Sequence, residues 1–374
     1  MTSTSGVGPI IPDYAGANVR GIVPALLGPS TWSAGTLPRW MPKPVVDSEQ
    51  CVLLVLDGLG WDQFQTHRDL MPTLSTFVGQ SIHTVAPTTT ATALTSITTG
   101  LTPGEHGLVG YRMMLGGDVL NVLRWAVDDT IVRRQQPPPA VQPFDPFLGY
   151  AVPVVSMAEL ENSAFSEAHL RGSTPVGWRA PSSIAVTAAA QIAAGERFVY
   201  CYYGSIDKIA HERGFGPYYE AELRAADRLV ADMLEALPSG TSLMITADHG
   251  QVHVGDNIIH PSEELLRGVT AQSGEGRFRW LHTSPGAQVD VAEIATAEVG
   301  DTAWVATKEQ VIDEGWFGPT VAPPVRARLG DVALVARDDV TFHENADSGM
   351  YQLICRHGSL TSAEVNVPLV AATA

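Results

Sequence analysis

The sequence predicts an α/β fold, a three-layer sandwich in which helices flank a largely parallel central β-sheet. Three continuous apolar runs are rich in β-branched and aromatic residues, which is typical of strands buried on both faces of a parallel sheet. They are CVLLVLD at 51–57, RFVYCYY at 197–203 and TSLMITAD at 241–248. Helical patterns alternate with these runs, and this alternation favours an α/β sandwich.

The clearest helical pattern covers residues 217–238. It begins at Pro217 and ends at Pro238, and proline is common at both kinds of helix boundary. One wide apolar stripe runs along it, formed by Leu223, Ala226, Leu229, Val230, Met233, Leu234 and Leu237. Such a stripe indicates a helix that packs one face against the core.

Residues 88–100, TTTATALTSITTG, have the composition of a polar linker. At helical spacing, however, four apolar residues fall on one face: Ala91, Leu94, Ile97 and Leu101. The segment is therefore predicted as a helix, with Thr90 capping its N-terminus.

Residues 1–374 are predicted to form a single domain with an N-terminal arm and two insertions. The N-terminal residues 1–45, with scattered glycines and prolines, are expected to form a wrapping arm. Residues 112–180 and 251–350 are rich in proline, glycine and short strand signals. Both are predicted as insertions on the sheet that form a cap or substrate-side subregion.

The composition excludes several classes of protein. With 45% hydrophobic and 17% charged residues, the chain is expected to fold as a soluble protein. A net charge of −17 argues against binding a nucleic-acid polymer through its phosphates. Any phosphate-bearing substrate would have to be neutralised locally, by a metal or a few arginines. The partner is thus expected to be a small molecule, while the oligomeric state stays open.

Targeting signals are not apparent in the sequence. The first residues, MTSTSGVGPIIPDY, lack the basic and apolar segments of a signal peptide, and no apolar run approaches the length of a membrane span. A cytoplasmic location without membrane contact is therefore expected. Three cysteines give no disulfide framework, and burial as packing residues is expected for Cys51 and Cys201.

Carboxylate and imidazole side chains follow the predicted strands, at the sheet edge where open α/β folds bind ligands. Alone, each such residue is more often a helix cap or a surface contact than a ligand. Their recurrence at successive strand ends indicates a metal site. The six candidates are Asp57, Asp207, His211, Asp248, His249 and His357. Six ligands exceed one tetrahedral site, so two neighbouring divalent ions are predicted.

Thr90 is the candidate nucleophile. A hydroxyl is a poor nucleophile at neutral pH, but coordination to a divalent metal can deprotonate it. Its place at a helix N-terminus adds backbone N–H groups that point at an incoming phosphoryl oxygen.

In this order, the motifs resemble the alkaline phosphatase superfamily, and within it the type I phosphodiesterase and nucleotide pyrophosphatase branch. The P-T-x-T platform followed by G-L-x-P-x-x-H-G is filled in register from Pro87 to Gly107. The resemblance spans residues 51–358. It implies that Thr90 becomes transiently phosphorylated or nucleotidylated.

The same resemblance implies two zinc ions. One would be bound by Asp207, His211 and His357. The other would be bound by Asp57, Asp248, His249 and the Thr90 oxygen. The substrate phosphate would bridge the two ions.

Two positions depart from the branch. The residue after the nucleophile, an aromatic that stacks on the base in nucleotide pyrophosphatases, is Ala91 here. Tyr111 occupies the place of an asparagine that holds a phosphoryl oxygen, so it is predicted to bind substrate. Both changes bear on nucleotide specificity.

The expected function is metal-dependent hydrolysis of phosphodiester or phosphoanhydride bonds. Alternatives on the same metal platform are a phosphomonoesterase, a phosphonate C–P hydrolase and a phosphoryl transferase. A non-enzymatic, metal-stabilised scaffold is a third reading. Because no basic residue stands beside Thr90 in the sequence, diesters are expected to be preferred to monoesters, unless Arg112, Arg171 or Arg179 folds back over the phosphate.

Overall fold

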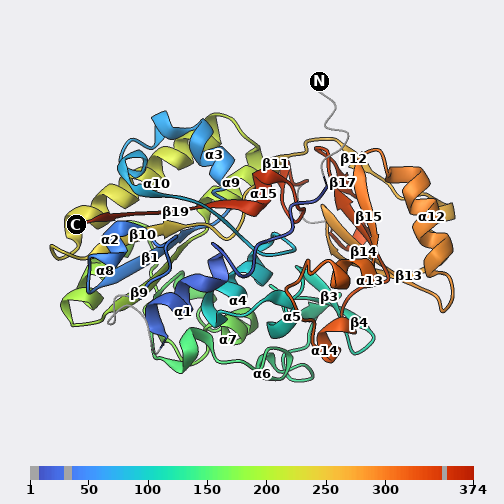
Figure 1. Cartoon of the computed structure of the whole chain (residues 1–374), viewed down its shortest axis with the longest axis horizontal. Helices are drawn as coiled ribbons and strands as arrows, with labels where there is room; N and C mark the ends of the chain where they lie inside the picture. Colours follow the sequence, from blue (N-terminus) through green and yellow to red (C-terminus); the bar gives the residue numbers. More distant parts are fainter. Residues whose placement is uncertain (1–7, 29–35, 348–351) are drawn as a thin grey trace.

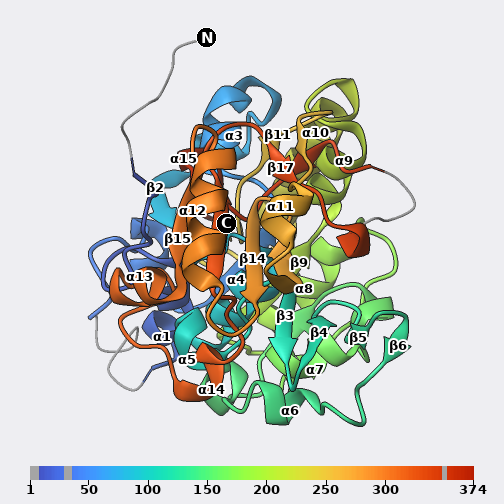
Figure 2. The same ribbon diagram turned by 90° about the vertical axis from the view of Figure 1, so that its right-hand side faces the viewer.

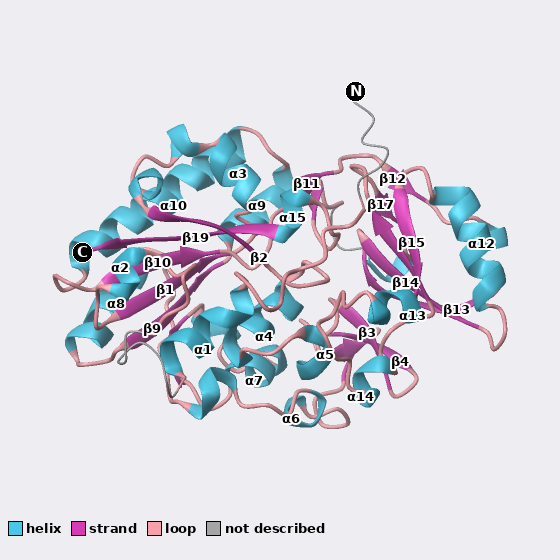
Figure 3. Cartoon of the chain, viewed as in Figure 1, coloured by secondary structure: helices cyan, strands magenta, loops and turns pink. Residues whose placement is uncertain are grey.

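The chain contains two β-sheets, each with its own layer of helices (Figure 1 and Figure 3). A computed structural model describes residues 8–28, 36–347 and 352–374. The first sheet occupies one half of the molecule and carries the C-terminal strand, and the second occupies the other half. Turned by 90°, the second sheet faces the viewer (Figure 2).

The central sheet has seven strands in the order β2-β19-β10-β1-β9-β7-β8. Their bounds are β1 Cys51–Leu56, β2 Val78–His83, β7 Pro153–Val155, β8 Thr174–Pro175, β9 Phe198–Tyr203, β10 Ser242–Thr246 and β19 Asn366–Thr373. The run from β10 to β8 is parallel, whereas β19 is antiparallel to both of its neighbours. The three strands predicted from apolar runs are β1, β9 and β10, which lie side by side at its centre.

Helices cover both faces of this sheet (Figure 1). They are α1 Ile22–Leu27, α2 Lys43–Val46, α3 Trp61–Thr66, α4 Thr90–Thr99, α7 Ala164–Leu170, α8 Ser183–Ala193, α9 Ser205–Arg213, α10 Pro217–Ala236 and α15 Ser362–Val365. Helices α3 and α10 lie on one side and α1, α4 and α7 on the other. The predicted three-layer α/β sandwich is therefore confirmed. Among the described residues, no helix combines the length and the apolar composition that crossing a membrane requires.

The second sheet has eight strands, and neighbouring strands in it pair antiparallel. In spatial order they are β15 Ala303–Thr307, β16 Val332–Ala336, β14 Phe278–Thr283, β13 Val269–Glu275, β3 Arg112–Leu115, β4 Asp118–Asn121, β5 Ala126–Val127 and β6 Thr130–Ile131. The helices of this half and its border are α5 Pro103–His106, α6 Pro138–Val141, α11 Glu263–Leu266, α12 Gln288–Val299, α13 Lys308–Asp313 and α14 Pro323–Arg326.

The predicted insertion 112–180 is divided between the two sheets. Strands β3 to β6 belong to the second sheet, but β7 and β8 extend the parallel central sheet beside β9. Both strands are very short, so their apolar runs are too brief to show in the sequence.

Two pairs of short strands join the halves: β11 Val252–His253 with β18 Cys355–Arg356, and β12 Ile258–Ile259 with β17 Thr341–Phe342.

The described part of the N-terminal arm contacts both halves of the molecule. The Tyr14 hydroxyl donates to the Trp316 carbonyl and accepts from the Ala86 N–H. The Ile10 N–H donates to the Leu360 carbonyl. The arm therefore ties the second sheet to the loop that leads into α4.

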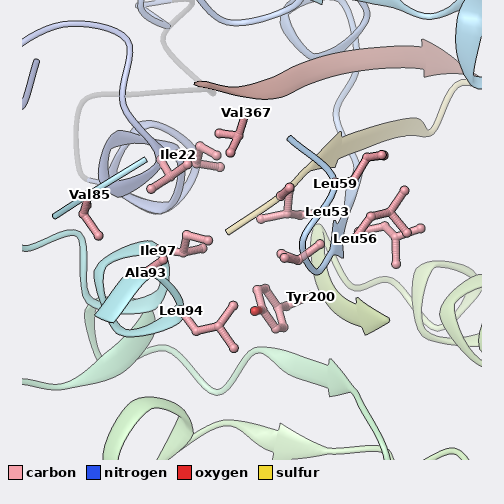
Figure 4. Packing of buried hydrophobic residues seen from close by; sticks show 14 of the residues in the cluster. Ile22, Leu53, Leu56, Leu59, Val85, Ala93, Leu94, Ile97, Tyr200 and Val367 are labelled. Carbon is pink, nitrogen blue, oxygen red and sulfur yellow. The ribbon is translucent and has the colours of Figure 1, made fainter. Parts of the chain in front are cut away.

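Helix α4 is buried almost all round, which explains its threonine-rich composition. In Figure 4, Leu94 and Ile97 of α4 point toward the same core as Leu53 and Tyr200 of the central sheet. On its other sides, the hydroxyls of Thr95, Thr98 and Thr99 donate to carbonyls one turn earlier. Threonine satisfies its own hydroxyl in this way, so the helix is buried without unpaired polar groups at these positions.

The N-terminal boundary of α4 differs by one residue from the prediction. Thr89, not Thr90, is the N-cap, because Thr89 has an extended backbone with φ −138° whereas Thr90 is the first helical residue. The helix ends at Gly100 in the left-handed region with φ 74°, so the predicted stripe residue Leu101 lies beyond it.

His106 joins α4 to the loop that follows. Its Nδ1 accepts from the Leu108 N–H at 3.1 Å, and its Nε2 lies 2.8 Å from the Ser96 hydroxyl. Burial, helped by the nearby charge of Arg328, lowers the pKa of His106 to about 3. The ring is therefore neutral in the folded protein, and it donates its Nε2 proton to Ser96.

We expect His106 to make the metal-free protein less stable in acid. Below about pH 6.5 the unfolded chain protonates this histidine while the folded chain does not, so its contribution to stability is complete above that pH and is lost as the pH falls toward 3. Urea unfolding at about pH 7.5 and about pH 5 should show a drop larger in the unchanged protein than in His106→Gln by about 2 kcal/mol. Equal drops would contradict the assignment.

Candidate active site and metal centre

The predicted ligand residues lie where three adjacent parallel strands end. Asp57 directly follows β1, Asp207 lies in the first turn of α9 after β9, and Asp248 follows β10. The backbone fixes their order, since the Asp57 N–H donates to the Tyr203 carbonyl at 3.0 Å and the Asp207 N–H donates to the Asp57 carbonyl at 3.1 Å. All three carboxyl groups therefore meet at one edge of the sheet.

The first group of potential ligand atoms contains Asp57, Asp248 and His249, all buried, with ligand atoms within 4.8 Å of one another. The His249 Nε2 lies 3.5 Å from Asp57 Oδ1 and 3.5 Å from Asp248 Oδ2. The Thr90 hydroxyl lies 3.1 Å from the same nitrogen. Thr90 thus faces the first group directly.

The second group contains Asp207, His249 and His357. His211, one helical turn beyond Asp207 on α9, places its Nε2 3.2 Å from Asp207 Oδ1, and the His357 Nε2 lies 3.8 Å from that oxygen. The rings of His249 and His357 stack with centroids 3.7 Å apart. His249 therefore lies between the two groups, and the structure brings all six candidate ligands and Thr90 together.

All three histidines present the same nitrogen to the carboxylates. The Nδ1 of His211, His249 and His357 lies 2.6, 3.1 and 2.8 Å from the carbonyl oxygens of Cys355, Gly250 and Thr88 respectively. A carbonyl oxygen only accepts, so each Nδ1 carries the proton. In the neutral rings Nε2 is then left with its lone pair directed at the site, which is the arrangement that metal-binding histidines adopt.

Like charges compete in this site. Burial, together with the charges of Asp248 and Asp207, raises the pKa of Asp57 well above its usual value. Burial also opposes ionisation of Asp207, but His211 and the other two histidines outweigh it and lower the pKa of Asp207. Three adjoining carboxylates, of which Asp57 and Asp248 are fully buried, cannot all be charged without a counter-charge, and a divalent cation supplies one.

Two carboxylate oxygens are left without a partner. Within the described residues, Asp57 Oδ1 and Asp248 Oδ2 are buried and accept no hydrogen bond. The second oxygen of each group is bonded: the Tyr202 hydroxyl donates to Asp57 Oδ2, and the N–H groups of Gly58 and His249 donate to Asp248 Oδ1, both at 3.1 Å. Each carboxylate is therefore oriented by one oxygen and offers the other. Together with three imidazole nitrogens, this donor set fits a divalent metal such as zinc.

Thr90 is held by the strand segment that precedes it. The Thr88 N–H donates to the Gly358 carbonyl at 3.2 Å, and the Gly358 N–H donates to the Thr88 hydroxyl at 3.0 Å. As the first residue of α4, Thr90 also stands where a helix presents unpaired N–H groups and positive partial charge. The hydroxyl and an anion-binding helix end thus coincide.

Thr90 lines two cavities. The larger, about 250 Å³, is lined by residues that include Thr90, Asp207, His211, His357, Glu275, Gly276, Asp347, Leu353 and Arg356. The smaller, about 180 Å³, is mostly apolar and is lined by residues that include Leu94, Leu123, Leu160, Phe165, Leu170, Tyr200 and Tyr202. Leu123 borders both, so the two cavities adjoin at Thr90.

Tyr111, predicted to bind substrate, lines the larger cavity. Its hydroxyl accepts a hydrogen bond of 2.7 Å from the side-chain amide of Asn121 on β4. That bond fixes the oxygen and leaves the hydroxyl proton of Tyr111 available for a ligand.

Several residues of the site were not predicted from the sequence. Tyr202 orients Asp57, and the Gln251 amide donates to Asp207 Oδ1 at 2.8 Å. Glu275 reaches the site from β13, where burial raises its pKa to about 8 although Thr89 hydrogen-bonds to it. Arg356, next to His357 in the sequence, also lines the cavity with Thr90. Its position beside a ligand motif was the signal that could have identified it.

No basic residue stands beside Thr90 in the sequence, but Arg356 lines the larger cavity together with Thr90. The three arginines named from the sequence do not border either cavity. Arg112 pairs with Glu344, Arg171 donates to backbone carbonyls, and Arg179 is an exposed partner of Glu159. Arg356 provides the cation instead, because the pairing of β18 with β11 brings it to the site. The three cysteines are buried and free.

The chain was compared with known proteins on this basis. Residues 51–360 match the sequence profile of the family described as type I phosphodiesterase / nucleotide pyrophosphatase. The chain belongs to this family. The protein is accordingly a metal-dependent enzyme that hydrolyses phosphoesters. No curated protein sequence matches it significantly.

Solved structures with similar folds include an ectonucleotide pyrophosphatase / phosphodiesterase and a phosphonoacetate hydrolase. Murine ectonucleotide pyrophosphatase / phosphodiesterase 5 is 14% identical, with 86% of this chain and 87% of that chain covered and a TM-score of 0.64. The human counterpart is 16% identical with the same coverage and TM-score. Phosphonoacetate hydrolase from Sinorhizobium meliloti 1021, in complex with phosphonoacetate, is 16% identical, with coverages of 87% and 90% and a TM-score of 0.64. At these identities the likeness establishes the fold.

We expect Asp57→Asn to stabilise the metal-free protein while weakening its response to metal. The substitution removes one of three competing charges, which should raise the free energy of unfolding by about 1–3 kcal/mol without metal. Urea unfolding with and without an added divalent ion measures both effects. Asp227→Asn is the matched control, because both oxygens of this buried carboxylate accept from the Thr73 and Leu74 N–H groups, and its loss should destabilise. Destabilisation by Asp57→Asn without metal would contradict the role of charge repulsion.

Proposed function

We propose that the protein is a two-zinc hydrolase of phosphodiester or phosphoanhydride bonds that uses Thr90 as its nucleophile. The observation that carries this proposal is the Thr90 hydroxyl at the edge of the larger cavity, 3.1 Å from the His249 Nε2 in the group of buried carboxylates. A threonine in a merely structural helix would have no reason to face that group.

The ligand sets follow the two sides of the site. Asp207, His211 and His357 would hold one ion. Asp57, Asp248 and His249, together with the Thr90 oxygen, would hold the other. When bound, the ions supply the positive charge that lowers the pKa of the hydroxyl and neutralises the phosphoryl oxygens.

The chain's own residues then carry the transfer. The Thr90 oxygen attacks phosphorus, and its proton passes to solvent. A P–O bond to Thr90 forms while the P–O bond to the leaving group breaks in line with it. Water subsequently attacks the threonine ester from the vacated side and restores the hydroxyl. Tyr111 donates a hydrogen bond to a phosphoryl oxygen during both steps and keeps its proton, and the N-terminus of α4 favours the negative charge.

The smaller cavity is suited to the part of the substrate that does not react. It is lined by apolar and aromatic side chains and adjoins Thr90, so it would take an apolar or aryl substituent. The solved neighbours support a small-molecule substrate: an inactive variant of the murine enzyme binds AMP, and the Sinorhizobium meliloti enzyme binds phosphonoacetate.

A second candidate function is hydrolysis of a small phosphonate on the same platform. The observation that favours it is Arg356, a cation in the cavity beside Thr90. A phosphomonoesterase or a phosphoryl transferase would use the same residues.

Thr90→Ala should lower turnover about a thousandfold or more while the protein stays folded, since removing a covalent nucleophile has effects of that order. Thr92→Val is the matched control, because the Thr92 hydroxyl is buried two residues away and has no partner among the described residues. Steady-state hydrolysis of bis(4-nitrophenyl) phosphate measures both. Equal losses would show that the threonines act through helix stability.

Thr88 is expected to behave differently from both. Its hydroxyl donates to the Ser359 carbonyl at 2.9 Å and accepts from Gly358, so Thr88→Ala should lower stability as well as activity. A loss of activity without loss of stability would assign Thr88 a direct role.

The protein should retain two divalent ions per chain after dialysis. Elemental analysis provides the count, and chelator treatment should abolish activity that zinc restores. His357→Ala should lower the count to one and leave the Asp57 group loaded. One ion or none in the unchanged protein would refute the two-metal assignment.

A further inference from the structure

Arg356 lies in the sequence between two residues that each contribute to the candidate metal site. On β18, the Cys355 carbonyl accepts from His211, and His357 follows directly as a candidate ligand. Arg356 stands between them and its side chain borders the larger cavity together with Thr90. The position of the guanidinium is thus fixed by the same backbone that places two ligands.

Among the described residues, the charge of Asp347 acts on Arg356, but Arg356 forms no ion pair. Arg112 pairs with Glu344 and Asp347, Arg279 also pairs with Asp347, and Arg277 forms two bonds of 2.8 and 2.9 Å with Glu364. These carboxylates are therefore occupied by other arginines. For Arg356 itself, no ion pair within 4.0 Å is found among the described residues, and its buried Nε has no hydrogen-bond partner there.

The wall of the cavity is shaped to admit the guanidinium. A side chain at Gly276 would place its Cβ 2.8 Å from an Arg356 terminal nitrogen and 2.3 Å from the Thr341 hydroxyl. The absence of a Cβ at 276 therefore lets Arg356 lie against β13. Burial of an unpaired guanidinium is costly unless an anion completes it, because the desolvated charge needs hydrogen-bonding acceptors.

We propose that Arg356 selects the substrate by binding a second anionic group, a carboxylate or a phosphate, beside the phosphorus that Thr90 attacks. This inference rests on the proposed function. The attacked phosphoryl group would face Thr90 and the six candidate ligands, whereas the Arg356 guanidinium lies against Gly276, in the turn after β13 of the second sheet, and lines the same cavity. The substrate class is therefore a phosphoanhydride or a carboxylated phosphonate, rather than a diester with two neutral substituents.

Binding of three ligands that share a phosphonate group on a one-carbon unit tests this proposal. Methylphosphonate lacks the second anion, phosphonoacetate adds a carboxylate, and methylenediphosphonate adds a second phosphonate. Isothermal titration of zinc-loaded Thr90→Ala protein measures their affinities without turnover. Arg356→Gln should weaken binding of the preferred ligand with a second anionic group about 10–100-fold, as loss of a charged hydrogen-bonded pair does. Binding of methylphosphonate should change less than about threefold. The ligand with the larger loss identifies carboxylate or phosphate.

Two further variants complete the test. Arg356→Lys keeps the charge but not the planar fork, so it should recover part of the affinity. Arg179→Gln removes an exposed arginine outside both cavities and should change none of the affinities.

Two results would overturn the proposal. Equal weakening of all three ligands would mean that Arg356 binds the attacked group or maintains the fold of the site, and no weakening would mean that it binds no ligand. If methylphosphonate, phosphonoacetate and methylenediphosphonate all fail to bind the zinc-loaded protein with Arg356 intact, the proposed function itself is refuted. This outcome differs from the two above, which concern Arg356 alone.

Discussion

Mutual repulsion of three adjoining carboxyl groups, two of them buried, is the constraint on which the rest of this structure depends. Asp57, Asp207 and Asp248 meet because β10, β1 and β9 are adjacent and parallel, and an acidic residue follows each strand within a few positions. Their proximity opposes folding unless a cation is bound. The surrounding groups make the arrangement tolerable: Tyr202, Gln251 and the backbone N–H of Gly58 each take one carboxylate oxygen. The carboxylate repulsion thus lowers the stability of the metal-free fold and at the same time favours binding of a cation, as is common at catalytic centres.

The second half of the molecule determines what else enters the cavity. The central sheet and α4 provide Thr90 and most of the candidate metal ligands, whereas Glu275 and Gly276 come from the end of β13 and the turn after it, and Tyr111 from the approach to β3. A site with one wall from each sheet can keep its chemistry while its substrate changes, because substitutions in the second sheet leave the ligand geometry untouched. The departure at Tyr111 belongs to this adjustable side, whereas Ala91 lies on α4 directly after the candidate nucleophile.

Local patterns in the sequence predicted the central strands and the ligands, because both depend on short segments. The apolar run of β1 followed by Asp57 is one such segment, and the Asp207–His211 spacing on α9 is another. Residues whose position depends on distant pairing were missed. Arg356 reaches Thr90 only through the pairing of β18 with β11, and β7 and β8 are too short to show a period. The one-residue error at Thr90 arose because a run of three threonines gives equal capping signals, and only the backbone conformation of Thr89 distinguishes them.

The acceptors that orient His211, His249 and His357 are all main-chain carbonyl groups, from Cys355, Gly250 and Thr88. A main-chain acceptor persists whatever side chain its residue carries, provided that the backbone path is kept. The tautomers of the three imidazoles are therefore protected against most point mutations in their surroundings. Substitutions around the centre can then change the neighbouring side chains without changing the direction in which the three ring nitrogens point.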